Sequence, residues 1–171
     1  MSPIAPINVL VLCTGNSARS ILGEALFNHL GAGRVQAYSA GSQPAGKVNP
    51  VALETLEKHG VPLPADVRSK SWDEFAKHDA PSIDYIFTVC ASAAGEMCPI
   101  WPGHPTTAHW GIADPAHVEP IEARREAFEK AYASLEKRIK AFLALDLETM
   151  SGKDVATAAR LIHDAVGSTE S

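Results

Sequence analysis

Apolar positions along this chain alternate between short continuous runs and stretches with helical spacing. The continuous runs, rich in β-branched residues, predict buried strands at 8–12, 35–39, 83–89 and 106–110. Apolar residues at intervals of three and four predict helices over 18–30, 48–59, 71–77 and 121–145. Strands that alternate with helices are typical of parallel sheets. The pattern therefore predicts an α/β fold: a single domain with a four-stranded parallel sheet and helices on both faces.

Local signals mark where several of these elements begin and end. Asn49-Pro50 is expected to begin the second helix and Gly60 to end it. Ser71 is a good N-cap for the third, with Glu74 as its capping-box partner. We predict a main domain over 1–146 and a C-terminal helical extension over 147–171, with its helix near 154–166. The pattern leaves open whether this helix packs on the domain.

Length and charge narrow the possible functions. The 171 residues carry 46% apolar positions and a formal net charge of −5, which argues against nucleic acid or an anionic membrane as partner. No apolar run has membrane-spanning length, and residues 1–6 lack signal-peptide regions. We therefore expect a cytoplasmic protein, where thiols stay reduced. The three cysteines are then expected to serve chemistry and not structural disulfides.

The segment between the first predicted strand and helix carries the strongest chemical signal. Its residues are Cys13-Thr14-Gly15-Asn16-Ser17-Ala18-Arg19-Ser20. The chain must turn sharply here, and Gly15 and Asn16 are residue types that tolerate a left-handed backbone. Backbone N–H groups of such a turn, with the N-terminus of the next helix, attract an anion. We predict that residues 14–20 bind a tetrahedral oxyanion and that Cys13 is the nucleophile.

Two side chains of this loop would complete the site. Arg19 can bind two oxygens of an anion at once. Ser20 can donate a hydrogen bond to the sulfur of Cys13, and together these groups favour the thiolate. The alternative, a buried cysteine near an arginine used in a surface ion pair, explains neither the turn nor the serine.

The other two cysteines, Cys90 and Cys98, follow the third predicted strand. Their separation is too long for a Cys-x-x-Cys pair and matches no usual zinc spacing. The small residues between them would let the segment fold back until the two sulfurs meet. The alternative is that one or both are inert buried thiols.

A candidate general acid follows the fourth predicted strand. Asp114 precedes a proline, in a loop expected at the same edge of the sheet as Cys13 and Cys90. A carboxyl group there can protonate an oxygen leaving group, although Asp-Pro is also common in plain turns. The seven histidines include no helical i, i+4 pair, so we expect no metal site.

These motifs occur in an order that resembles a known family. The further segments that carry the resemblance are Glu24-Ala25, Ser39-Ala40-Gly41, Val89-Cys90, Cys98-Pro99, His109-Trp110-Gly111 and Asp114-Pro115. Over about residues 7–145 the chain resembles the thioredoxin-coupled arsenate reductases of the low-molecular-weight tyrosine phosphatase fold. The pair Cys90 and Cys98 distinguishes this group from the phosphatases of the same fold.

The resemblance implies a mechanism for arsenate detoxification. Cys13 would attack arsenate, which residues 14–20 hold, while Asp114 protonates the departing oxygen. Cys90 would then attack Cys13 and release arsenite, and Cys98 would attack Cys90. The resemblance also implies that no cofactor is bound: the protein uses a redox-active disulfide and takes electrons from an external thiol donor, thioredoxin or glutaredoxin.

The chain departs from the family pattern at two places. Ala91-Ser92 stands where the family often has Asp-Asn. Ser69-Lys70 replaces a serine followed by an acidic residue in members that bind potassium, so we expect the Lys70 ammonium to take the place of the cation and no potassium dependence.

Two other functions remain open at this point. One is a phosphatase for phosphotyrosine or small phosphomonoesters that uses Cys13, Arg19 and Asp114 alone. Ala116 and Ala18 argue against it, because phosphatases of this fold usually carry an aromatic residue and a second cysteine there. The other is an oxyanion-binding thiol redox sensor, in which Cys90 resolves an oxidised Cys13.

Overall fold

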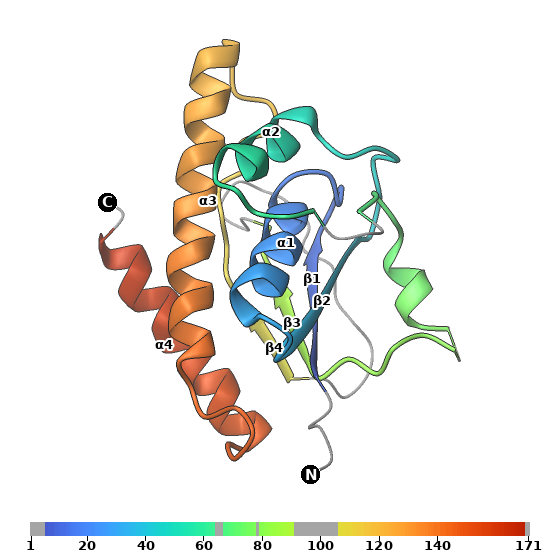
Figure 1. Ribbon diagram of the computed structural model, residues 1–171, viewed down its shortest axis with the longest axis vertical. Coiled ribbons are helices and arrows are strands. Elements are labelled where there is room, and N and C mark those ends of the chain that lie inside the picture. The colour runs from blue at the N-terminus through green and yellow to red at the C-terminus, as the bar shows by residue number, and fades with distance from the viewer. Residues whose placement is uncertain (1–5, 64–66, 78, 91–105, 170–171) are drawn as a thin grey trace.

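The computed structural model describes residues 6–63, 67–77, 79–90 and 106–169. Figure 1 shows the described elements in their spatial arrangement. In chain order they are β1 (Ile7–Cys13), α1 (Arg19–Gly31), β2 (Val35–Gly41), α2 (Pro50–Lys58), the 3-10 helix η1 (Trp72–Phe75), β3 (Tyr85–Thr88), β4 (Thr106–His109), α3 (Ile121–Leu143) and α4 (Gly152–Thr169).

The four strands form one sheet in the order β2-β1-β3-β4, and every neighbouring pair is parallel. β1 lies in the middle of the sheet, where Leu12 pairs with Ala40 on one side and with Thr88 on the other. The strands therefore end together at one edge of the sheet, and Cys13 is the last residue of β1. The predicted fold class, a single α/β domain with a four-stranded parallel sheet, is confirmed.

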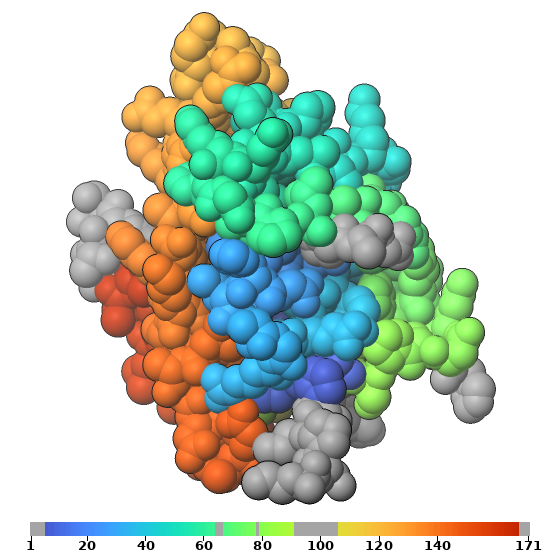
Figure 2. All heavy atoms as spheres, in the orientation of Figure 1, coloured from blue at the N-terminus to red at the C-terminus, as the bar shows by residue number. Residues whose placement is uncertain are grey.

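The sheet separates two apolar clusters of different size. The larger cluster joins β1, β3 and all four α-helices, with Phe27, Phe87, Trp110 and Phe142 in mutual ring contact. In Figure 2, the atoms of α1, α2 and α3 pack against one another on the face toward the viewer. On the opposite face, a smaller cluster around Leu10 and Leu12 packs against residues of η1.

The start of the third predicted helix differs from expectation. Where a helix was predicted over 71–77, the chain makes only the four-residue turn η1. Ser71 does cap it, because its side chain accepts a hydrogen bond from the N–H of Asp73. The capping-box role of Glu74 is wrong: its carboxylate accepts two hydrogen bonds from the guanidinium of Arg68, at 2.8 and 2.5 Å. A charged partner six residues back outcompetes a single backbone N–H.

The C-terminal helix α4 is packed against the rest of the domain, which answers the question that the sequence left open. Its residues Val155 and Ala159 are buried in the larger cluster, and the helix contacts β4 and α3. The indole N–H of the fully buried Trp110 donates to the carbonyl oxygen of Ala159 at 2.9 Å. No described helix is both long and apolar enough to cross a membrane.

Candidate active site

A pocket of about 290 Å³ opens at the carboxyl ends of the strands. Residues from three parts of the chain line it. The end of β1, the loop after it and the first residue of α1 supply Cys13, Thr14, Gly15, Ser17, Ala18 and Arg19; the segment after β2 supplies Ala45; and the segment after β4 supplies Asp114, Ala116 and His117. The structure thus brings the predicted nucleophile, the predicted arginine and the predicted acid into one cavity.

The carbonyl groups of the loop after β1 are hydrogen-bonded to neighbouring segments. Those of Thr14, Gly15 and Ser17 accept hydrogen bonds from backbone N–H groups of residues 43–49, at 2.8–3.0 Å. Ser69 Oγ also donates to the carbonyl of Gly15, at 3.1 Å. A loop whose carbonyl groups are occupied in this way can present its N–H groups to an anion.

The left-handed residue of the loop is Asn16, with φ 46°, while Gly15 does not have a positive φ. Asparagine tolerates this conformation because its short polar side chain forms local hydrogen bonds. The close approach in this region is instead made by Gly41. A Cβ there would lie well inside van der Waals distance of the Thr14 carbonyl oxygen, so only glycine lets β2 end against the loop.

A chain of hydrogen bonds leads from the sulfur of Cys13 into the protein. Cys13 Sγ lies 3.0 Å from Ser20 Oγ, and Asn16 Nδ2 donates to that same oxygen at 2.8 Å. Since Ser20 Oγ accepts from Asn16, its own proton is available to the sulfur. The backbone N–H of Lys70 donates to Asn16 Oδ1 at 2.8 Å and fixes the amide in this orientation.

Arg19 connects the loop of residues 14–20 to the segment that carries Asp114, the predicted acid. Its Nη1 donates to the carbonyl of Ile112 at 2.9 Å, and its Nη2 lies 3.6 Å from Asp114 Oδ2. Asp114 Oδ1 accepts from the backbone N–H of Ala116 at 2.9 Å, which closes a tight turn around the carboxylate. The guanidinium is therefore buried beside the pocket with its plane held by the acid segment.

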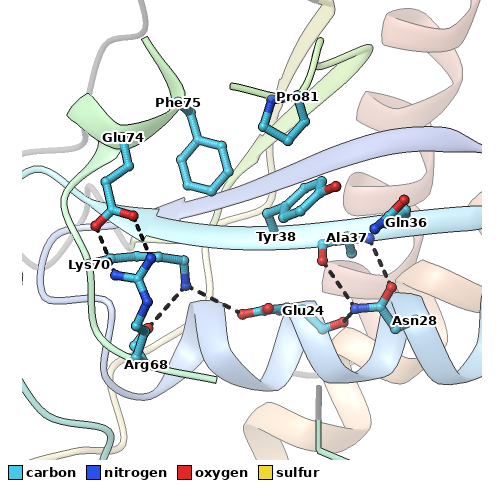
Figure 3. A pocket seen from close by; sticks show the side chains of 10 residues that line it. All are labelled: Glu24, Asn28, Gln36, Ala37, Tyr38, Arg68, Lys70, Glu74, Phe75 and Pro81. Atoms are coloured by element: carbon cyan, nitrogen blue, oxygen red, sulfur yellow. Dashed lines mark hydrogen bonds and ion pairs between the residues drawn. The ribbon is translucent and has the colours of Figure 1, made fainter. Parts of the chain in front are cut away.

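Behind the loop, Lys70 and Glu24 form a buried ion pair with Nζ and Oε1 4.0 Å apart. Glu24 Oε1 also accepts from Ser39 Oγ at 2.5 Å, and Lys70 Nζ donates to the carbonyl of Arg68 at 3.0 Å. Figure 3 shows Lys70 directed toward Glu24 along one wall of a second cavity, of about 510 Å³. Burial beside Glu24 raises the pKa of Tyr38 in the same cavity, the desolvation of its phenol being the larger cause.

The two remaining cysteines differ in what the structure says of them. Cys90 comes just after β3, is fully buried and is disulfide-bonded, whereas Cys13 is a free thiol. The backbone N–H of Val89 donates to the carbonyl of Leu12, so Cys90 stands at the strand end next to that of Cys13. Cys98 lies outside the described residues. Within the described ranges no group of His, Cys, Asp and Glu side chains could hold a metal ion.

Sequence reasoning missed two contributors to the pocket. Ser69 stabilises the loop through its hydrogen bond to the carbonyl of Gly15. From the sequence, Ser69 was considered only as the neighbour of Lys70. His117 lines the pocket and was not singled out, although its place three residues after the predicted acid was a usable signal.

Comparison with known proteins identifies the family. A model of the family described as low molecular weight phosphotyrosine protein phosphatase matches residues 8–155. The chain belongs to this family. Its match covers the sheet, the loop of residues 14–20 and the acid segment, and it ends at the beginning of α4.

Members of the low molecular weight phosphatase family that resemble this chain include arsenate reductases. Those of Bacillus licheniformis and Shouchella clausii are 35% identical over 136 residues and 33% identical over 135 residues, each covering 78% of this chain and 93% of the relative. The solved arsenate reductase of Archaeoglobus fulgidus superposes with a TM-score of 0.60 at 29% identity, over 77% of this chain and 98% of that chain. A thioredoxin-dependent arsenate reductase of Corynebacterium glutamicum gives 0.53 at 28% identity, over 81% of this chain and 64% of that chain.

Proposed function

We propose that this member of the family reduces arsenate to arsenite through a thiol–disulfide relay that begins at Cys13. One observation carries the proposal: the pocket joins a free cysteine, Arg19 and Asp114, while a second cysteine stands at the neighbouring strand end. The similarity to arsenate reductases supports the same function.

In the first step, arsenate binds with its oxygens on the inward N–H groups of residues 14–19 and on Arg19. The Cys13 thiolate attacks arsenic and forms a sulfur–arsenic bond. The arsenic–oxygen bond opposite the sulfur breaks, and Asp114 gives its proton to that oxygen, which leaves as water. Asp114 is placed for this because it faces the same pocket as the sulfur.

The second step requires Cys90 in its reduced form, so an external dithiol first reduces the disulfide that Cys90 forms in this structure. The thiolate of Cys90 then attacks the sulfur of Cys13. A Cys13–Cys90 disulfide forms, the sulfur–arsenic bond breaks and its electron pair stays on arsenic, which leaves as arsenite. Cys98 then attacks Cys90, so that Cys13 is released as a thiolate and a Cys90–Cys98 disulfide remains. An external dithiol of the thioredoxin type reduces this disulfide, and we place the enzyme in the cytoplasm, where such reductants act. A glutaredoxin donor is the alternative.

Phosphatase activity is the second candidate, and the family itself favours it. Phosphate has the same shape as arsenate and would meet the same loop. It cannot continue along the relay, because phosphorus does not accept the electron pair. The pocket is lined by Ala45 and Ala116 and contains no Phe, Tyr or Trp among its described residues, so a phenyl ester finds none of these rings to stack on.

The deciding experiment is NADPH consumption by the protein with thioredoxin and thioredoxin reductase, with and without arsenate. The relay predicts consumption that requires arsenate and is matched by arsenite formation. Cys13→Ser is the control for reactions at the other cysteines. Failure with both thioredoxin and a glutathione–glutaredoxin donor, together with rapid hydrolysis of a phosphomonoester, would establish the phosphatase instead. Oxidation by peroxide without any arsenate requirement would favour the redox sensor.

A further inference from the structure

His117 is a polar side chain of the active-site pocket to which the relay gives no role. The pocket extends from Cys13, which is 3% exposed, to Asp114, whose side chain is 35% exposed, and to the exposed His117. Its closed end therefore holds the sulfur, and its mouth is formed by the acid segment. His117 stands at the mouth, on the side of the acid.

The turn that carries His117 is well fixed. The N–H of Ala116 donates to Asp114 Oδ1 at 2.9 Å, and Pro115 in between is buried. The N–H of Val118 donates to the carbonyl of Pro115 at 3.4 Å, so residues 115–118 close a turn. The backbone of His117 therefore keeps its place relative to the carboxylate of Asp114.

The positive charge available to a substrate in this pocket is limited. Arg19 is the one guanidinium among the lining residues, and it already binds the carbonyl of Ile112 and faces Asp114. Among the described residues that line the cavity, His117 is the only other side chain with a ring N–H or a possible positive charge. The hydroxyl groups of Thr14 and Ser17 belong to the loop itself, so His117 is the described donor on the side of Asp114.

The geometry of displacement says which oxygen this is. A nucleophile and its leaving group lie on opposite sides of the reacting atom, so three oxygens of arsenate face the loop and the fourth faces the mouth. In arsenate the fourth oxygen is free, with lone pairs open to a donor besides Asp114. In a phosphate or arsenate ester it carries an organic group, which would occupy the space beside His117.

We propose that the His117 ring N–H donates a hydrogen bond to the leaving oxygen of an inorganic oxyanion, and that this contact selects arsenate over organic esters. The inference rests on the proposed function for its substrate. His117 is here a specificity-determining contact, and Asp114 remains the group that transfers the proton.

The first test measures binding without turnover. Arsenate and phenyl phosphate are titrated calorimetrically into Cys13→Ser and into Cys13→Ser/His117→Ala. Loss of a hydrogen bond to a charged oxygen is expected to raise the arsenate Kd about tenfold, with less than a twofold change for phenyl phosphate. Equal losses for both anions, or no loss for arsenate, would overturn the inference.

The second test measures kcat/KM for arsenate with the complete reductant system. His117→Ala is expected to lower it about tenfold, and His117→Gln, which keeps an N–H donor, to restore most of it. Val118→Ala is the matched control, since this residue shares the turn and does not line the pocket. A thermal melt shows that each variant is folded.

The outcomes separate this inference from the proposed function. Arsenate turnover that His117→Ala leaves unchanged would retain the reductase and remove the contact. Weaker arsenate binding in His117→Ala, without turnover in the wild-type protein, would retain the contact and remove the reductase. A protein that neither binds nor reduces arsenate would contradict both.

Discussion

Cys13 and Cys90 stand at the ends of two neighbouring parallel strands, yet their surroundings differ. Cys13 opens onto a pocket, and its sulfur lies 3.0 Å from a serine hydroxyl backed by Asn16 and Lys70. Cys90 is fully buried and does not line that pocket. Its neighbours Val89 and Ile112 are apolar and buried, and the N–H of Ile112 donates to the carbonyl of Val89.

The difference shows that strand position alone does not give a cysteine the polar surroundings that favour a thiolate. The same sheet edge supplies both residues, and Cys13 is marked by the donors Ser20 and Asn16. A thiolate is stabilised by hydrogen bonds and positive charge, whereas burial among apolar groups keeps a thiol inert. In the proposed relay, Cys90 attacks once its own disulfide has been reduced and the sulfur of Cys13 carries arsenic.

The largest effect is expected from removal of the Cys13 thiol. Cys13→Ser is expected to abolish arsenate reduction and any phosphatase activity, because a hydroxyl does not ionise in this loop at neutral pH. NADPH-coupled assays and hydrolysis of p-nitrophenyl phosphate measure both. Turnover of arsenate by this variant would show that another group is the nucleophile.

The second prediction concerns Cys90 and Cys98, the later cysteines of the proposed relay. Cys98→Ser is expected to permit one turnover at most and to trap a Cys13–Cys90 disulfide, since nothing then resolves it. Non-reducing peptide mass mapping after one equivalent of arsenate identifies the bond. Sustained turnover with thioredoxin would exclude Cys98 from the relay.

A third prediction tests the buried pair of Lys70 and Glu24 behind the loop that follows Cys13. Lys70→Asp places two carboxylates together in a buried site and is expected to lower the free energy of unfolding by about 3 kcal/mol in the absence of potassium. Potassium chloride is expected to restore part of the loss, whereas choline chloride at equal ionic strength is not. The exposed Lys77→Asp is the control. A wild-type protein that potassium stabilises would contradict the proposal that Lys70 replaces the cation.

A smaller effect is expected from the apolar packing on the β3–β4 side. Trp110→Phe keeps a ring among Phe27, Phe87 and Phe142 but loses the hydrogen bond to Ala159. Urea unfolding should show a loss of about 1–2 kcal/mol. Leu161→Ala, on the same helix but 59% exposed, should change stability little. Equal effects of the two substitutions would mean that α4 is not anchored through Trp110.

The smallest effect lies at the opposite end of the sheet, far from both cysteines. Arg34 donates to Glu148 at 2.6 and 3.0 Å, and this hydrogen bonding lowers the pKa of Glu148. A carboxyl group with a lowered pKa stabilises the fold above its unfolded pKa, and the contribution disappears as pH falls through the folded value. Glu148→Gln should therefore lower Tm by about 1 °C at pH 7, and by progressively less as the pH falls below the ordinary pKa of glutamate. The rate of arsenate reduction is expected to be unchanged in Glu148→Gln, in contrast to the substitutions in the active-site pocket.

The strands and helices of the domain were predictable because hydrophobic periodicity reports burial directly. The strand ending at Cys13 and the helix capped by Asn49 needed nothing beyond local sequence. The residue of the loop that adopts the left-handed conformation is Asn16 and not Gly15. This choice depended on a hydrogen bond from Lys70, which lies 54 residues further along the chain. The hydrogen bonding of Glu74 to Arg68 was also missed, because helix-capping rules do not consider a competing arginine side chain.

The site was predictable in composition but not in arrangement. Spacing indicated Cys13, Arg19 and Asp114, while the pairing of Arg19 with Ile112 and Asp114 depends on how the segment after β4 returns to the loop. No local pattern indicated that Ser69 would hydrogen-bond to the loop after β1, because serine is common in turns. The packing of α4 also escaped prediction, since its apolar stripe is compatible with a free helix until Trp110 supplies a partner.

The position of α4 has a consequence for how molecules of this protein meet one another. β4 is the last strand of the order β2-β1-β3-β4, and an exposed last strand is a template for strand addition between copies. α4 packs beside β4, and its residues Lys153 and Arg160 border the cavity next to Thr107 and His109. We therefore expect this helix, of which the family match includes only the first residues, to hinder a strand of another molecule from pairing with β4.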